Sequence, residues 1–257
     1  MTYDSTLSEE DKKRRIEHQD RCYQEHLRTG DTSVKLNGIK LVVPQNVFLP
    51  MADWKWNLLA QTVLMEVKET DRVLDMGTGS GIQAIFAASK SRDVTAVDLN
   101  PLAVDCAKMN AELNGVSSRV KVLESNLFEN VEGKFDLVIF DPPFRWTKPR
   151  DVWEICSADE GYVTLQTFLS EVRDYLTITG RVLMFFGTSG DLAYFKRLIR
   201  KNGFKREQIL KSLKNERGWE YFTFKLTKST QNPAYKVDNS YLKKIKRLQN
   251  DNRTYQP

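Results

Sequence analysis

The sequence has few of the residues that build metal sites, histidine-based triads or disulfide frameworks. Its 257 residues include only three cysteines and two histidines. Cys22, Cys106 and Cys156 lie far apart without the spacing of a metal site, which favours free thiols in a reducing cytoplasm. His18 and His26 both fall in a charged N-terminal stretch. We therefore expect neither a zinc site nor a histidine triad, and no metal cofactor.

Long apolar runs are also missing. No stretch is long enough to span a bilayer, and the N-terminus opens with polar and charged residues, unlike a secretory signal. These absences predict a cytoplasmic protein without a membrane partner. The hydrophobic content of 40% suits one sizeable α/β domain with small additions.

The excess of positive charge is a weak pointer to nucleic acid. The net charge is +5, and the sequence pI is about 9.0. Two local clusters, at 12–15 and 243–247, hold much of the excess. Because such runs are usually solvated faces, charge alone does not decide the class of partner.

The sequence divides into three parts. Residues 1–50 are expected to form an N-terminal helix plus a β-hairpin extension, residues 51–228 the main α/β domain, and residues 229–257 a basic polar tail. The pair Asn37-Gly38 is the strongest two-residue signal for a hairpin turn. Ser8 followed by Asp11 resembles a capping box at the start of the first helix.

Strand and helix patterns alternate from Arg72 onward. This alternation predicts a mostly parallel sheet with helices on both faces, and two runs after the last helix predict a closing antiparallel hairpin. The expected fold is a seven-stranded α/β sheet. Strands are predicted at 34–43 (a hairpin), 72–76, 93–98, 119–123, 136–140, 181–186, 204–210 and 219–226, and helices at 8–28, 53–67, 80–89, 101–114, 162–177, 190–202 and 240–249.

A glycine-rich turn follows the first strand of the main domain. The run Gly77-Thr78-Gly79-Ser80-Gly81 comes directly after Asp75-Met76 and leads into a helix. Its spacing differs from the dinucleotide fingerprint, so a nucleoside without pyrophosphate fits better than NAD. Asp75 could hold a cationic ammonium group. A glycine turn that serves packing alone is the alternative.

Polar groups end the next two strands. Asp98, in Asp98-Leu99, lies 23 residues after Asp75, close to the spacing of the acid that binds ribose hydroxyls in dinucleotide folds. Asn126, in Asn126-Leu127, offers an acceptor and donors that suit the edge of an adenine. An amino acid, a ribose and an adenine together make up S-adenosylmethionine.

The run Asp141-Pro142-Pro143-Phe144 ends the fourth strand. The Asp141 carboxylate and the Pro142 carbonyl can accept both hydrogens of a planar NH2 group, the prolines stiffen the turn, and Phe144 can stack on the substrate. Asp141 could also pair with a sulfonium and accept the departing proton. A plain β-turn is the alternative, since Asp-Pro often opens turns.

A basic and aromatic segment follows. Arg145, Trp146 and Lys148 suit contacts to a phosphate backbone and a flipped base, and suit an acidic protein loop almost as well. A surface loop without a substrate role is the third interpretation.

Taken in order, these motifs resemble those of class I S-adenosylmethionine-dependent methyltransferases. The resemblance covers residues 34–228 and rests on VLDMGTGSG, AVDLN, Asn126-Leu127 and the Asp-Pro-Pro-Phe turn. Within that class the chain is similar to the HemK-type, small-domain N-methyltransferases. The resemblance implies a Rossmann-like fold, S-adenosyl-L-methionine as cofactor and S-adenosyl-L-homocysteine as product.

The acceptor turn departs from the HemK-type pattern. That group usually has Asn-Pro-Pro-Tyr, whereas this chain has Asp141 and Phe144. Asp-Pro-Pro-Phe resembles some RNA guanine-N2 methyltransferases instead. The sequence therefore favours an amino nitrogen of RNA or DNA, with a protein glutamine loop or a small-molecule amine as alternatives. A non-catalytic cofactor-binding subunit is disfavoured because the acceptor turn is intact.

Overall fold

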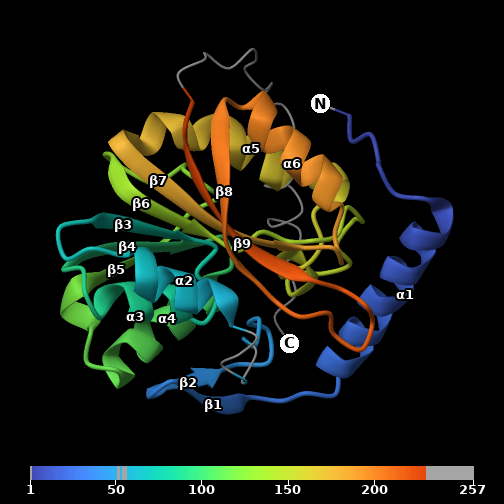
Figure 1. The fold of residues 1–257 in the computed structure, drawn as a ribbon. Helices are drawn as coiled ribbons and strands as arrows, with labels where there is room; N and C mark the ends of the chain where they lie inside the picture. Colours follow the sequence, from blue (N-terminus) through green and yellow to red (C-terminus); the bar gives the residue numbers. More distant parts are fainter. Residues whose placement is uncertain (1, 51–52, 54–56, 230–257) are drawn as a thin grey trace.

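A seven-stranded sheet forms the centre of the protein in the computed structural model, which describes residues 2–50, 53 and 57–229 (Figure 1). The expected tail over 229–257 and its helix at 240–249 lie outside the described residues, apart from Ser229. In the described part, no helix is long and apolar enough to cross a membrane.

The strand order is β5-β4-β3-β6-β7-β9-β8. All neighbouring pairs from β5 to β7 are parallel, whereas β9 runs antiparallel to both β7 and β8. The predicted parallel sheet with a closing antiparallel hairpin is confirmed. The strands are β3 (Arg72–Met76), β4 (Asp93–Asp98), β5 (Val120–Glu124), β6 (Phe135–Phe140), β7 (Leu176–Gly187), β8 (Phe204–Lys211) and β9 (Tyr221–Lys228).

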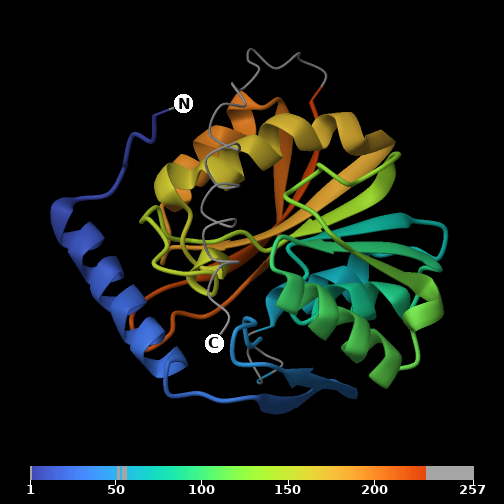
Figure 2. The same ribbon diagram turned by 180° about the vertical axis from the view of Figure 1, so that it is seen from behind.

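Helices cover both faces of this sheet (Figures 1 and 2). Val138 and Phe140 of β6 pack in the core shared with α5 and α6, whereas Leu137 and Ile139 pack in the core shared with α2, α3 and α4. Burial on both faces explains why the strands read as continuous apolar runs. The helices are α2 (Leu58–Glu66), α3 (Ile82–Ala88), α4 (Pro101–Leu113), α5 (Val163–Glu171) and α6 (Leu192–Lys201).

The N-terminal extension consists of α1 (Glu9–His26) and a hairpin of β1 (Thr32–Leu36) and β2 (Ile39–Val43). The Ser8 hydroxyl accepts a hydrogen bond from the Asp11 amide at 3.1 Å, so Ser8 caps α1 as predicted. Asn37 and Gly38 both have positive φ, at 46° and 86°, as a type I′ turn requires. The hairpin adds a separate small sheet to the main one.

Helix α1 lies beside the loops that follow β6 and β7 (Figures 1 and 2). Arg15 donates to the Thr188 carbonyl at 2.7 Å, and Gln19 donates to the Glu154 carboxylate at 2.9 Å. Both side chains are buried although α1 is polar in sequence. Polar contacts therefore hold α1 close to the edge of the sheet where the parallel strands end.

Two predicted helices differ from the structure. The helix expected at 53–67 is described only as α2, because 54–56 lie outside the described residues. The helix expected at 162–177 ends at Glu171 and continues as a 3-10 turn, because the following residues already pair as β7 with β6. Tertiary pairing overrides local helix propensity there. The 3-10 turns are Ser117–Arg119, Glu154–Cys156, Glu160–Tyr162 and Val172–Tyr175.

Candidate active site

The candidate site lies at the point where the strand order reverses. Strand β3 has β4 on one side and β6 on the other. From β3 the chain first adds β4 and β5 on one side of it and then adds β6 and β7 on the other. Open α/β sheets bind ligands outside the carboxyl ends of the strands at such a switch point. The glycine turn after β3, Asp98 at the end of β4, and Asp141 after β6 all lie there.

The glycine turn after β3 needs its glycines. Gly77, Gly79 and Gly81 have φ values of 65°, 53° and 84°, which side chains disfavour. A Cβ on Gly81 would also lie 3.1 Å from the Ala107 Cα atom, so helix α4 packs directly against the turn. The Thr78 amide donates to the Val97 carbonyl at 2.9 Å. Backbone atoms can therefore come close to a ligand here.

Asp75 lies beneath this turn. Its carboxylate accepts hydrogen bonds from the Thr78 hydroxyl at 2.6 Å and the Ala84 amide at 3.0 Å. Burial raises the pKa of Asp75 to about 7, although these two hydrogen bonds oppose the shift. Thr78 is itself buried and turned toward Asp75, so its hydroxyl supports the turn. The predicted contact of Asp75 with an ammonium group stays a prediction.

Asp98 joins the end of β4 to the glycine turn. One carboxylate oxygen accepts from the Gly79 amide and the other from the Asn100 amide, both at 2.9 Å. Burial raises the pKa of Asp98, against the effect of these backbone hydrogen bonds. Leu99 follows and is half-buried. Asp98 is thus placed at the strand end as expected, and part of its hydrogen-bonding capacity orders the turn.

The loop after β5 holds an unsatisfied donor. The Nδ2 atom of Asn126 is buried and has no hydrogen-bond partner among the described residues. Leu127 has a φ of 50°, which is unusual for a branched side chain and stores strain. The Ser125 hydroxyl holds this shape by donating to the Leu127 carbonyl at 2.8 Å and accepting from the Asn130 amide at 3.0 Å. A free donor in a strained loop fits a ligand with an acceptor edge, such as adenine.

Asp141 begins the turn after β6. Its side chain is exposed, but surrounding protein still desolvates the carboxyl group, and Asp75 adds a like charge. Desolvation, and then Asp75, raise the pKa of Asp141 to about 7. Pro142 and Pro143 are buried and fix the turn. The half-buried Phe144 ring packs against Phe186 at a centroid distance of 4.7 Å.

The three strand-end carboxylates share one property. Among the described residues, no lysine or arginine forms an ion pair with Asp75, Asp98 or Asp141. A cation bound at the switch point would offset their desolvation. S-adenosylmethionine carries two cationic groups, a sulfonium and an ammonium, so the residues present fit this cofactor.

The segment after the turn is less exposed than predicted. Lys148 is exposed and Trp146 is half-buried, but Arg145 is only 5% exposed. Its guanidinium donates to the Ser189 carbonyl at 2.5 Å, and its burial lowers its pKa. The charge of Arg145 is buried because the loop folds back and pairs with residues 157–159. The predicted role of Arg145, Trp146 and Lys148 in substrate binding stays a prediction.

Two residues at the site were not singled out from the sequence. Ser125 shapes the loop around Asn126, and the Tyr162 hydroxyl donates to the Phe144 carbonyl at 2.7 Å. No local pattern marks Tyr162, since it lies 18 residues after Phe144. Ser125 directly follows a strand end beside Asn126, and that position could have drawn attention to it.

In the described ranges, no three His, Cys, Asp or Glu side chains gather closely enough to hold a metal ion. The strand order, the glycine turn at the switch point and the acidic strand ends instead define a class I S-adenosylmethionine-dependent methyltransferase.

The chain belongs to the methyltransferase small domain family, whose sequence profile matches residues 40–198. It is 36% identical over 156 residues to a putative protein N5-glutamine methyltransferase of Methanocaldococcus jannaschii, covering 58% of this chain and 76% of that protein. It is 38% identical over 129 residues to the release factor glutamine methyltransferase of Deinococcus radiodurans, covering 49% of this chain and 44% of that enzyme. The family resemblance inferred from the motifs is confirmed.

Solved structures share the fold. The tRNA m1G37 methyltransferase of Methanocaldococcus jannaschii superposes with a TM-score of 0.58 at 19% identity, covering 78% of this chain and 57% of that chain. At this identity the likeness bears on the fold alone. The predicted Rossmann-like architecture is thereby confirmed.

Proposed function

We propose that this enzyme methylates an amino nitrogen of a nucleic-acid base, most simply one whose edge presents two adjacent N–H donors, as guanine does. The proposal is supported by the Asp141 carboxylate, which follows β6 at the switch point, three residues before Phe144, and forms no ion pair among the described residues. An ionised carboxylate offers only acceptors. It therefore complements an edge that presents only donors better than an amide, which also presents a carbonyl acceptor.

In this proposal the strand ends hold the cofactor. Asp75 faces the ammonium group, Asp98 the ribose hydroxyls and Asn126 the adenine, while Gly77, Gly79 and Gly81 let the backbone approach. Thr78, Leu99 and Leu127 belong to the same three cofactor-binding segments. S-adenosyl-L-methionine supplies an electrophilic methyl group and leaves as S-adenosyl-L-homocysteine, with no metal required.

Asp141 and the Pro142 carbonyl then orient the acceptor. An exocyclic amine is a poor nucleophile because its lone pair is delocalised into the ring. Two acceptors that grip its N–H bonds aim the lone pair and stabilise the positive charge that grows on nitrogen. With a pKa of about 7, Asp141 can also accept the departing proton near neutral pH. Phe144 stacks on the base, which contributes about 1–3 kcal/mol.

A nucleic-acid substrate fits the composition of the chain and its surface at the acceptor turn. The net charge is +5, and Lys148 is exposed five residues after Pro143. The free thiols of Cys22, Cys106 and Cys156 agree with a cytoplasmic location, which is part of the proposal.

Protein glutamine is the second candidate. The observation that favours it is the 36% identity to a protein named as a putative N5-glutamine methyltransferase. A glutamine amide presents two N–H donors and a carbonyl acceptor. Asp141 can accept from the NH2 group but cannot donate to the carbonyl, whereas an asparagine at this position could do both.

The substrate class can be tested with methyl-labelled S-adenosylmethionine and fractionated cell extract. We expect label in material that ribonuclease or deoxyribonuclease degrades. Label found only in protease-sensitive material would overturn the nucleic-acid proposal in favour of the second candidate.

Substitution of Asp141 tests the mechanism itself. Asp141→Ala should lower turnover by about 10²–10⁴-fold, the usual loss for an acid–base group, while cofactor binding persists. Asp93→Asn, an exposed aspartate at the start of β4, serves as the control. Asp141→Asn separates the two candidates: it should impair methylation of a base but preserve methylation of a glutamine amide. Unchanged turnover in Asp141→Ala would refute the assignment.

A further inference from the structure

Tyr162 connects the acceptor turn to the rest of the protein. Its side chain is completely buried, and its hydroxyl makes two hydrogen bonds. It donates to the Phe144 carbonyl at 2.7 Å and accepts from the Asp191 amide at 2.9 Å. The hydroxyl thus links the last residue of the acceptor turn to the first turn of α6.

The same carbonyl is confined from a second side. A Cβ on Gly190 would lie 2.8 Å from the Phe144 carbonyl oxygen and 2.8 Å from the Phe186 ring. Only a residue without a side chain leaves the carbonyl in its present place. Tyr162 and Gly190 together therefore fix the position of the Phe144 carbonyl.

Tyr162 adopts a conformation that tyrosine disfavours. Its φ is 58°, and that of the preceding Gly161 is 65°. A bulky residue in the left-handed region costs free energy and persists only where the surroundings enforce it. Here the enforced conformation brings the hydroxyl to the acceptor turn.

The N-terminal segment contacts Asp191, whose backbone amide donates to the Tyr162 hydroxyl. Its carboxylate accepts from the Tyr3 hydroxyl at 3.0 Å and from the Thr6 amide at 2.8 Å, and the Thr6 hydroxyl bonds to it as well. Asp191 also caps α6 through the Tyr194 amide at 3.0 Å. Residues far apart in sequence therefore hold Asp191 in place, and the Asp191 amide in turn holds the Tyr162 hydroxyl.

We propose that Tyr162 is a positioning residue for methyl transfer: its hydroxyl holds the Phe144 carbonyl so that Asp141, Pro142 and Phe144 point at the acceptor nitrogen. This inference rests on the proposed role of the Asp141–Phe144 turn. Tyr162 touches neither reactant in this scheme. It acts through the turn, whose two prolines transmit a displacement of Phe144 to Pro142 and Asp141 because they stiffen the backbone.

The variant Tyr162→Phe removes the hydroxyl and keeps the ring. Tyr194→Phe is a matched control, because the Tyr194 ring stacks on Tyr162 at 5.5 Å and its hydroxyl makes no hydrogen bond in the described part of the chain. Misplacement of reacting groups by about 1 Å can cost about 100-fold in rate. We expect kcat to fall by up to about 100-fold in Tyr162→Phe, with the Kd for S-adenosylmethionine unchanged.

Hydrogen exchange followed by mass spectrometry reports on the turn without any substrate. Pro142 and Pro143 have no N–H, so the exchange measured in a peptide from this region comes mainly from the backbone amides of Phe144, Arg145 and the residues after them. The Arg145 amide donates to the Ser157 carbonyl at 3.0 Å. Exchange in this peptide should become faster in Tyr162→Phe than in Tyr194→Phe.

The outcomes are distinguishable. Faster exchange with a loss confined to kcat supports the positioning role. Unchanged exchange, or faster exchange with wild-type kcat, overturns it. If the wild-type enzyme transfers no methyl group to any extract fraction, the proposed function fails, and exchange still decides whether Tyr162 holds the turn. Should Tyr162→Phe not fold, Gly190→Ala moves the same carbonyl by steric contact and should show the same kcat-specific loss; wild-type kcat there overturns the proposal.

Discussion

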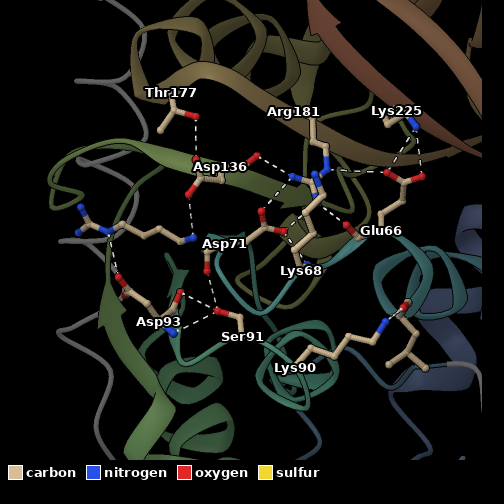
Figure 3. Close-up of polar contacts among 12 residues, drawn as sticks. Glu66, Lys68, Asp71, Lys90, Ser91, Asp93, Asp136, Thr177, Arg181 and Lys225 are labelled. Atoms are coloured by element: carbon tan, nitrogen blue, oxygen red, sulfur yellow. Dashed lines mark hydrogen bonds and ion pairs between the residues drawn. The ribbon is translucent and has the colours of Figure 1, made fainter.

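The parallel strands of the central sheet begin along one side, here called the beginning edge, and end along the opposite side, the ending edge. The carboxylates at these two edges differ in whether the protein pairs them with a cation. At the edge where the parallel strands begin, Asp71 pairs with Arg181 at 2.8 Å, and Glu66 pairs with Lys225 at 3.1 Å (Figure 3). At the edge where they end, Asp75 and Asp141 lack an ion pair in the described residues, and burial raises the pKa of each to about 7. The first edge is neutralised by the protein's own cations.

This difference separates stability from function within one sheet. A buried carboxylate is costly unless a cation or several donors accompany it. At the beginning edge, arginine and lysine side chains of the protein offset this cost. Asp136 lies at the same edge and accepts hydrogen bonds from the Arg72 amide at 3.0 Å and the Thr177 hydroxyl at 2.9 Å (Figure 3). At the ending edge, hydrogen bonds to Asp75 and Asp98 offset part of this cost, but no lysine or arginine of the described residues pairs with either carboxylate. The lack of such a cation is expected where an external cation binds.

The largest effect is expected at the beginning edge. Arg181→Ala leaves Asp71 buried without its partner and should lower the free energy of unfolding by about 3–5 kcal/mol, measured by urea denaturation. Cofactor affinity, measured by calorimetry where the variant is folded, should not change. Arg92→Ala is the control, because Arg92 and Glu69 form a pair in which both side chains are exposed, at 79% and 72%.

A second variant distinguishes pairing from packing. Replacing Arg181 by Met together with Asp71 by Leu removes both charges and should recover much of the lost stability, since apolar replacements of buried ion pairs are often neutral. A stability of Arg181→Ala equal to that of the wild type would show that the ion pairs do not stabilise this edge.

At the ending edge, the next largest effect should come from Asp98. Asp98→Asn loses the charge that can accept from ribose hydroxyls and from the Gly79 amide, so we expect affinity for S-adenosylmethionine to fall by about 1.5–3 kcal/mol, the usual range for hydrogen bonds to charged groups. Equal affinity by calorimetry would refute the ribose role.

Part of the expected loss of affinity would come from the weakened hydrogen bond between position 98 and the Gly79 amide. Comparing two ligands that differ only at the ribose 2′ position separates this part from ribose recognition. Wild-type protein should bind adenosine more tightly than 2′-deoxyadenosine, whereas Asp98→Ala, which keeps no acceptor at this position, should bind both alike. If the variant still discriminates, another group recognises the ribose.

The sheet could be predicted from sequence because its strands carry their own signals. Burial on both faces makes β3, β4 and β6 continuous apolar runs, and the glycine turn and Asp98 adjoin these runs directly. Strand ends of parallel sheets meet at one edge, so the side chains after them could be assigned to one site. For these residues, the position directly after an apolar run in the sequence also gives the position in the folded structure.

The surroundings of the acceptor turn could not be predicted in the same way. Arg15 and Arg145 read as surface charges, yet both are buried because they donate to the carbonyls of Thr188 and Ser189 after β7. Tyr162 reads as an ordinary core aromatic. These roles depend on contacts between distant segments, which neither periodicity nor turn chemistry reports.

The smallest effect concerns pH and distinguishes the cofactor from its product. Asp75 and Asp141 have an ordinary pKa of 3.8 that the fold raises to about 7. Between these values the folded protein binds more protons than the unfolded chain, so these groups lower stability as pH rises through this window. A bound cation favours the ionised carboxylates and lowers their pKa. Cofactor binding should therefore release protons and strengthen from pH 6 to about 7.5.

S-adenosylmethionine and S-adenosylhomocysteine share the ammonium group, but only the former carries the sulfonium charge. The affinity for S-adenosylmethionine should rise more steeply with pH, with an additional slope of at most about tenfold per pH unit, because Asp141 can release only one proton. Calorimetry in buffers of different ionisation enthalpy measures both the slope and the protons released. Asp141→Asn should make the two slopes equal. If they already coincide in the wild type, Asp141 does not face the sulfonium, and its raised pKa serves the acceptor nitrogen alone.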